Sequence, residues 1–350
     1  MDTNMNYQLP EEELLSCEII RDAKRAFSRC HFGASVYNIV AVAVMLIVEV
    51  VIIIALGIDK SQAVFNSPYF IWTMQVICMY VVAYPVFLLF VRKLPKAKRK
   101  KKPMSLEEFV VVFLISEGAM ISFALVSNLF LELLSSLLGY PIGDTTSDMI
   151  MDTPIWVVVL VAVIIGPIIE ELVFRKAFID ALSRYGDRVA IIFSAVAFGL
   201  FHGNFSQVFY ATAIGLIFGY VYTKTSNILY TILLHILINF MGTVPSLLVT
   251  DSMDRILNMT EETVFELSML SDIMLIYGVA IVQYTLAIAG VALFIYVTKN
   301  RLYKVPNSCE IQIPKRSYLS TILCNPGVIL FIIITILQFG SSILPPHIFN

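Results

Sequence analysis

Residues 154–181 read PIWVVVLVAVIIGPIIEELVFRKAFIDA and combine the length of a membrane-spanning helix with charged residues in its interior. Glu170 and Glu171 are adjacent, and Arg175 follows four residues after the second glutamate. A carboxylate or guanidinium near the middle of a bilayer costs roughly 2.5–3.5 kcal/mol on insertion scales. These charged residues within one apolar stretch therefore indicate a functional site inside the membrane.

The composition of the whole chain predicts a polytopic membrane protein. Of its 350 residues, 58% are hydrophobic and 14% are charged, and the mean hydropathy is +0.83. Soluble domains are roughly 45–50% apolar. The formal net charge of −2 gives no sign of a nucleic-acid partner. The five cysteines show no CxxC or similar spacing, so neither a disulfide framework nor a cysteine metal site is predicted.

Long apolar stretches predict an all-α fold, a polytopic transmembrane helical bundle of about eight or nine spans. A spanning helix takes around 20 apolar residues, and lipid cannot satisfy the open backbone groups of other structures. The predicted spans lie near 35–58, 69–91, 109–139, 154–180, 189–204, 206–223, 227–249, 272–297 and 323–344.

These spans divide the chain into four parts. Residues 1–34 are mostly polar and are expected to form a cytoplasmic segment, either an amphipathic helix at the membrane surface or a solvated cap. Residues 35–139 hold three spans. Residues 154–249 form the helical core that carries the charged site, and residues 250–350 hold an external loop and two further spans.

The basic run RKLPKAKRKKK, from Arg92 to Lys102, predicts the orientation of the bundle. By the positive-inside rule this loop lies in the cytoplasm, which also places the N-terminus inside and the loops at 140–153 and 250–271 outside. Binding of the run to anionic lipid headgroups is an open alternative. We expect an integral protein of a bacterial plasma membrane.

Two of the four histidines lie within apolar segments. His202 belongs to FGLFHGNF, and His235 belongs to LLHILINF, where Asn239 follows one helical turn later. Glu170 and His202 lie at equal sequence distances from Gly186 in the turn SRYGDR, so two antiparallel helices would bring them to one depth. A single such histidine is more often a helix-contact residue, but two beside a double glutamate favour a shared site.

A glutamate, two histidines and an asparagine in a low-dielectric pocket are suited to hydrolysis. Desolvation makes a glutamate a better general base toward water, and an imidazole can orient that water or protonate a leaving amine. Imidazole and amide groups one turn apart can also stabilise an oxyanion. No serine or cysteine stands beside these histidines in a motif such as GxSxG, which favours direct attack by water. The i, i+4 spacing of Glu171 and Arg175 pairs them on one helix face and leaves Glu170 free.

These residues resemble the motifs of the CPBP family, the CAAX prenyl-protease and bacteriocin-processing proteins, also called the Abi family of intramembrane proteases. The family pattern is a double glutamate with an arginine four after the second, then FxxxH, then HxxxN or HxxxD. The three parts are Glu170, Glu171 and Arg175 in EELVFR, Phe198 and His202 in FGLFH, and His235 and Asn239 in HILIN. The resemblance covers roughly residues 154–245.

The resemblance implies an intramembrane endopeptidase that hydrolyses membrane-associated, prenylated or leader peptides. Glu170 is then the base that activates water, and Glu171 and Arg175 hold the helix and its electrostatics. The groups that polarise water and stabilise the oxyanion are then His202, His235 and Asn239. The implied partners are a peptide or protein substrate and the lipid bilayer.

The sequence leaves a cofactor and two other functions open. The residues strictly require no cofactor, but Glu170, His202 and His235 also form a possible set for zinc or another divalent metal, as in a metalloprotease with Glu171 as the base. One alternative function is a non-catalytic bacteriocin-immunity or regulatory scaffold that binds a membrane partner. Another is a proton-coupled transporter that uses the buried acids as a relay.

Overall fold

The computed structural model describes residues 11–142, 150, 153–258, 267–305 and 309–344, and all regular structure in these ranges is helical. Seven helices within them are long and apolar enough to cross a membrane, or up to eight if a bent pair near the C-terminus is one span. The predicted all-α class is confirmed. The expected count is about eight or nine spans, and it agrees with the structure at eight, the upper end of the observed range.

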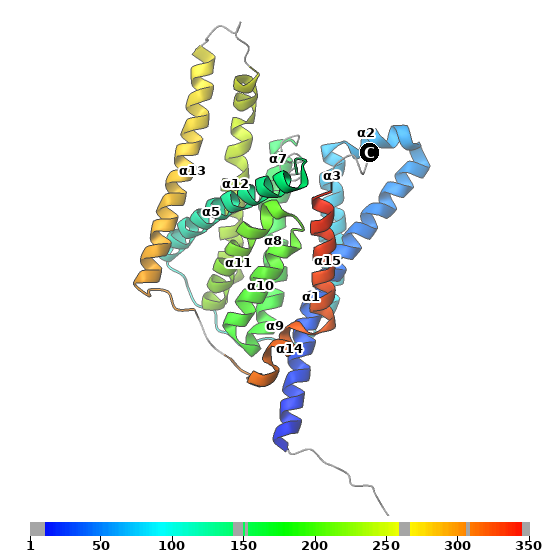
Figure 1. The fold of residues 1–350 in the computed structure, drawn as a ribbon, viewed down its shortest axis with the longest axis vertical. Helices are drawn as coiled ribbons and strands as arrows, with labels where there is room; N and C mark the ends of the chain where they lie inside the picture. Colours follow the sequence, from blue (N-terminus) through cyan, green and yellow to red (C-terminus); the bar gives the residue numbers. More distant parts are fainter. Residues whose placement is uncertain (1–10, 143–149, 151–152, 259–266, 306–308, 345–350) are drawn as a thin grey trace, which may run out of the picture.

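Figure 1 shows the arrangement of the helices. The long helices are α1 (Glu11–Leu56), α5 (Leu106–Leu138), α10 (Asp187–Phe201), α11 (Phe205–Thr225), α12 (Ile228–Leu257), α13 (Leu267–Lys299) and α15 (Pro326–Ser342). The short helices are α2 (Ile58–Phe65), α14 (Tyr318–Leu323) and the 3-10 turn η5 (Lys315–Ser317).

Two further spans are built from consecutive α-helical and π-helical stretches. The first consists of α3 (Pro68–Gln75), the π-helical η1 (Val76–Ala83) and α4 (Tyr84–Val91). The second contains α7 (Ile155–Val158), η2 (Val159–Ile165), α8 (Gly166–Glu171), η3 (Leu172–Ile179), α9 (Asp180–Leu182) and η4 (Ser183–Tyr185), of which η2 and η3 are π-helical. This second span carries the double glutamate.

The N-terminal helix α1 is unbroken, so residues 11–34 and the expected span at 35–58 belong to one helix. Residues 1–10 lie outside the described residues. One face of its first half is buried and packs against α15 (Figure 1). The two backbones touch at Gly327, where a methyl group would lie 1.8 Å from the carbonyl oxygen of Ser28. The cytoplasmic location expected for residues 1–34 stays a prediction.

The helices α10 and α11 form a closely packed hairpin. Gly186 has φ +131° and turns the chain from η4 into α10, at the turn expected from SRYGDR. A methyl group on Gly215 would lie 2.8 Å from the Cα of Ala195, so only a glycine allows this separation of the two helices. The expected span at 189–204 is a helix of 15 residues that ends at Phe201, which is shorter than a spanning helix.

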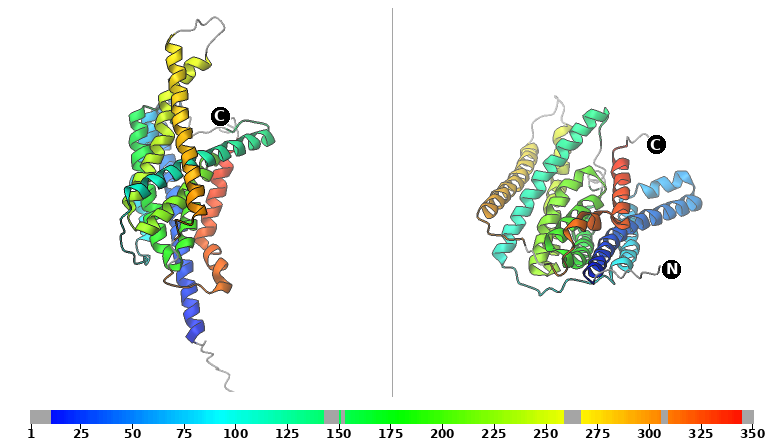
Figure 2. Two further views of the ribbon diagram at one scale, coloured as in Figure 1. Left: turned by 90° about the vertical axis from the view of Figure 1, so that its left-hand side faces the viewer. Right: turned by 60° about the horizontal axis from the view of Figure 1, so that its bottom comes forward.

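The C-terminal half of the bundle is held by α12, α13 and α5. Figures 1 and 2 show α5 running obliquely across the bundle with its C-terminal end projecting outward. At the crossing with α13, a methyl group on Gly290 would lie 1.8 Å from the carbonyl oxygen of Leu114. The helix α12 extends to Leu257, well into the loop expected at 250–271; residues 259–266 of that loop lie outside the described residues.

Candidate active site

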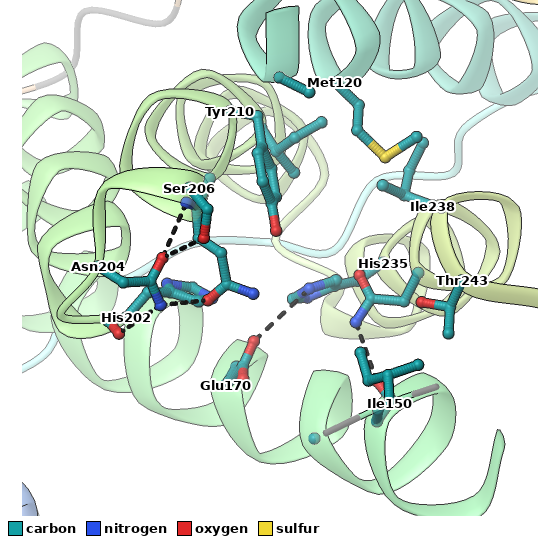
Figure 3. A pocket seen from close by; sticks show the side chains of 18 of the residues that line it. Met120, Ile150, Glu170, His202, Asn204, Ser206, Tyr210, His235, Ile238 and Thr243 are labelled. Carbon is teal, nitrogen blue, oxygen red and sulfur yellow. Dashed lines mark hydrogen bonds and ion pairs between the residues drawn. The ribbon is translucent and has the colours of Figure 1, made fainter. Parts of the chain in front are cut away.

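A partly open cavity of about 630 Å³ gathers four of the six side chains expected to form a site. Glu170 reaches it from α8, His202 from the turn between α10 and α11, and the other two from α12 (Figure 3). These two are His235 and Asn239. The three segments that carry the motifs therefore meet at one place, although 69 positions separate the first residue from the last.

The two adjacent glutamates have different surroundings. The side chain of Glu170 is 26% exposed and borders the cavity. The side chain of Glu171 is fully buried, and its Oε2 lies 3.2 Å from Nε of Arg175, which is also fully buried. An i, i+4 pair on a helix faces one way, so the neighbouring glutamate faces another.

Aromatic rings surround the guanidinium of Arg175. The guanidinium carbon lies 4.6 Å from the ring centre of Phe198 and 5.6 Å from that of Phe218. Within the described residues its nitrogens make no hydrogen bond of good geometry, so the ion pair with Glu171 and the faces of the two rings balance its charge. Phe198 thus supports the site electrostatically, which gives the phenylalanine of FxxxH a physical role.

His235 lies between the two carboxylates. Its Nδ1 is 3.0 Å from Oε1 of Glu171, and its Nε2 is 3.6 Å from Oε2 of Glu170. A carboxylate accepts hydrogen bonds, so the buried glutamate holds the proton on Nδ1 and fixes the orientation of the ring. In the neutral ring, Nε2 is then an acceptor at the cavity wall beside Glu170.

His202 is held by the turn that ends α10. Its Nδ1 donates to the carbonyl oxygen of Phe198 at 2.8 Å, which leaves Nε2 as the second ring nitrogen. Gly203 follows with φ +68°, a conformation that favours glycine. Asn204 then caps α11, since its Oδ1 accepts from the backbone N–H of Gln207 at 2.9 Å and its Nδ2 donates to the carbonyl of His202 at 3.1 Å.

Asn239 joins α12 to the π-helical stretch η2. The N–H of Gly166 donates to the carbonyl of Val161, five residues earlier, so the next donor in the same pattern would be Pro167. Proline has no N–H, and the carbonyl of Ala162 therefore lacks a partner within its own helix. Asn239 supplies one, because its Nδ2 lies 3.0 Å from that oxygen. One of its two amide N–H groups remains for the cavity.

The cavity has further polar lining that we did not single out in the sequence. Neutral amide and hydroxyl side chains contribute to it from several segments, among them Gln75, Tyr80, Asn128, Gln207, Tyr210, Thr243 and Gln283. Figure 3 shows the hydroxyl of Tyr210 directed toward the space between Glu170 and His235. The sequence signal for the amide residues among them is their position within apolar segments, because lipid cannot satisfy the hydrogen bonds of an amide side chain.

The side chains as they lie do not fit a metal ion. Over the described part of the chain, no group of three or more His, Cys, Asp or Glu side chains is placed to hold one. Glu170, His202 and His235, the set considered for zinc, are included in that statement. We therefore derive no chemical step through a metal.

The fold and the cavity define a polytopic helical membrane protein with acid, imidazole and amide groups around an internal site. Residues 152–241, which contain all six expected site residues, match the family described as "Type II CAAX prenyl endopeptidase Rce1-like". This match agrees with the motif resemblance to CAAX intramembrane proteases.

A protein of known name is similar to part of this chain. The Bacillus subtilis (strain 168) protein named "Putative membrane peptidase YdiL" is 33% identical over 93 residues. The similar region covers 26% of this chain and 37% of that relative, so the match spans little more than a third of the relative's length. No solved structure matches the chain.

Proposed function

We propose that the protein is an intramembrane endopeptidase in which Glu170 activates the water that cleaves a peptide bond. The observation that carries this proposal is the contrast between the two glutamates. Glu170 borders the cavity, whereas Glu171 is fully buried in an ion pair with Arg175. Two carboxylates in such different surroundings can take separate roles, one as base and one as a structural anion.

The contacts around His235 support a specific division of work. Glu171 fixes the ring so that Nε2 and the carboxylate of Glu170, 3.6 Å apart, face the same space. A water within hydrogen-bond reach of both gives its proton to Glu170 as its oxygen bonds to the substrate carbonyl carbon. When the C–N bond then breaks, the leaving nitrogen receives that proton from Glu170.

The developing oxyanion requires hydrogen-bond donors at the same place. We assign this role to the second amide N–H of Asn239. His202 lines the cavity on the other side of Glu170 (Figure 3), and its Nε2, an acceptor in the neutral ring, helps to orient the attacking water. Because Ala162 binds the first amide N–H, the amide plane is already oriented before substrate arrives. Such preorganisation is the usual source of oxyanion stabilisation.

The proposed substrate is a membrane-associated, prenylated or leader peptide. Apart from Glu170 and the two histidines, the described lining consists of neutral side chains, including Met79, Met120 and Trp72. Such a surface suits an uncharged peptide segment next to an apolar anchor. The family description names CAAX prenyl endopeptidases, which makes prenylated peptides one class to test.

The decisive experiment compares Glu170→Gln with wild type on a quenched-fluorescence peptide library in detergent. We expect the substitution to lower kcat by about 10²–10⁴-fold, the usual contribution of a general base. Glu132→Gln is the matched control, because this exposed glutamate of α5 does not line the cavity. A chelator arm tests for a metal requirement.

Full activity of Glu170→Gln would overturn the assignment of the base. Loss of activity with chelator, restored by zinc, would replace it with a metal-dependent route. If wild type cleaves no peptide but carries pH-driven flux in liposomes, the transporter alternative would replace the peptidase.

A further inference from the structure

The loop between α4 and α5 is an ordered basic segment, which we call the basic strap and define as residues 92–104. It connects the spans Pro68–Val91 and Leu106–Leu138, so both of its ends lie at the ends of candidate membrane spans. Figure 1 shows it passing along the end of the bundle near α9 and α11. The peptidase proposed above makes no use of this segment.

Backbone hydrogen bonds fix the basic strap against the bundle. The N–H of Ala97 donates to the carbonyl of Asp180 at 2.7 Å, and the N–H of Lys102 donates to the carbonyl of Thr225 at 2.8 Å. The N–H of Met104 donates to the hydroxyl of Tyr230 at 3.1 Å. A segment with no helix or sheet of its own is thus held in place by three separate elements.

The buried side chains of the basic strap are apolar or ion-paired, whereas its exposed side chains are mostly basic. Leu94 and Met104 are buried, and Arg99 forms an ion pair with Asp187. The remaining seven basic side chains are exposed: Arg92, Lys93, Lys96, Lys98, Lys100, Lys101 and Lys102. None of the ion pairs found among the described residues involves these seven.

Nearby carboxylates are committed to other groups. Oε1 of Glu310 accepts from the backbone N–H of Lys98 at 3.0 Å, and its Oε2 lies 3.4 Å from Nε of Arg184. Asp180 binds the ammonium of Lys176 at 3.0 Å. These two carboxylates are therefore not left to pair with the exposed lysine side chains of the basic strap.

We propose that the basic strap is a binding surface for the anionic headgroups of membrane lipids. Its position between two span ends places it at headgroup level, and its fixed backbone presents the ammonium groups without a backbone ordering cost on binding. Basic residues near an anionic leaflet each contribute about 1 kcal/mol, which corresponds to roughly fivefold in affinity. Lysines, as flexible point charges, suit mobile phosphates better than one rigid ligand.

The test uses the full chain reconstituted in phosphatidylcholine vesicles that contain a trace of spin-labelled lipid. The fraction of immobilised label gives the relative association of phosphatidylglycerol against phosphatidylcholine. We expect wild type to prefer the anionic lipid at least fivefold, and 0.5 M NaCl to remove most of the preference. Replacement of Lys96, Lys98, Lys100 and Lys101 by Gln should reduce it at least threefold.

Two control proteins make the result specific. Replacement of Arg21, Lys24, Arg25 and Lys60 by Gln removes the same number of basic residues from α1 and α2, and should leave the preference unchanged. The four-lysine variant with Arg in place of Gln retains the charges and should bind as wild type does. Because the substituted side chains are exposed, apart from the half-buried Lys24, and the backbone contacts stay, we expect all variants to fold.

Three results would overturn the proposal. The strap variant could keep the full preference, or the control on α1 and α2 could lose it equally. Alternatively, a soluble octaglutamate peptide could displace the anionic label from wild type at micromolar concentration, which would identify an acidic protein segment as the partner. The outcome does not depend on whether the protein cleaves peptides, since no substrate is present.

Discussion

Glu171 and Arg175 form an ion pair that solvent does not reach, whereas Glu170 borders a cavity. Removing one partner of a buried pair leaves the other charge uncompensated, at a cost of about 3–5 kcal/mol. We therefore expect Glu171→Gln to lower the thermal midpoint of the purified protein strongly, and Glu170→Gln to leave it nearly unchanged. Thermal unfolding in one detergent measures both. Equal midpoints for the two variants would contradict the different roles given to the glutamates.

The contact between Asn239 and Ala162 leads to a double-mutant cycle. Asn239→Ala leaves the carbonyl of Ala162 without a partner, which costs about 1–3 kcal/mol if the oxygen stays buried. Pro167→Ala supplies the backbone N–H that the π-helical pattern lacks, so it should reduce the loss caused by Asn239→Ala. Thermal unfolding of the two single variants and the double variant measures the coupling. Additive effects would show that the proline is not the reason for the contact.

The ionisable residues of the cavity could be predicted from the sequence, and their contacts could not. Glu170, His202 and His235 stand out because ionisable side chains in apolar segments are expensive. Neutral amides cost less, so Gln75 and Gln283, which reach the cavity from spans outside the matched segment, give a weaker signal. The contact of Asn239 with Ala162 depends on how two helices pack side by side, which sequence spacing does not encode.

At the scale of helices, α5 and α13 cross with their backbones in contact. A methyl group on Gly290 would lie 1.8 Å from the carbonyl oxygen of Leu114, so Gly290→Ala must push the helices apart. We expect a cost of about 1–3 kcal/mol, as for other overpacked sites, seen as a lower thermal midpoint.

Gly278→Ala is the matched control on the same helix, because no atom lies within 4 Å of the added carbon. Alanine is a better helix former than glycine, so this variant should be as stable as wild type or slightly more stable. A similar loss for both glycines would mean that close packing at Gly290 is not what the helix pair needs.

The helices themselves were largely predictable, but their internal geometry was not. Apolar runs located α5, α11, α12 and α13 to within a few residues or one to two turns, because a membrane helix must be long and continuous. The π-helical stretches η1, η2 and η3 leave no such trace, since a run of apolar residues suits either winding. The continuity of α1 across the expected boundary at residue 35 likewise depends on its packing against α15.

For the molecule as a whole, the orientation in the membrane is a prediction that two natural cysteines can test. Cys17 on α1 and Cys309 before η5 are exposed, and both lie in parts expected to be cytoplasmic. In intact cells they should resist a membrane-impermeant maleimide and react after permeabilisation. In a background without cysteines, Asn258→Cys at the end of α12 should react in intact cells. Labelling of Cys17 in intact cells would reverse the orientation.

The positive-inside rule reports only on which side a loop lies, so it could predict an orientation but not the order of the helices around the cavity. That order depends on close contacts such as Gly215 against Ala195 and Gly290 against Leu114. Each contact requires a glycine facing one particular neighbour. A sequence shows the glycine and leaves the neighbour unknown.

The short helix α10 has a consequence for the supply of water to the proposed site. With 15 residues it is about 22 Å long, whereas the hydrocarbon layer is about 30 Å thick. The polar turn at His202, Gly203 and Asn204 therefore ends below the level where neighbouring spans leave the lipid. In the peptidase proposed above, the shortness of α10 would bring water closer to His202 at this membrane face, beside the contact of Gly203 with Gln338 of α15.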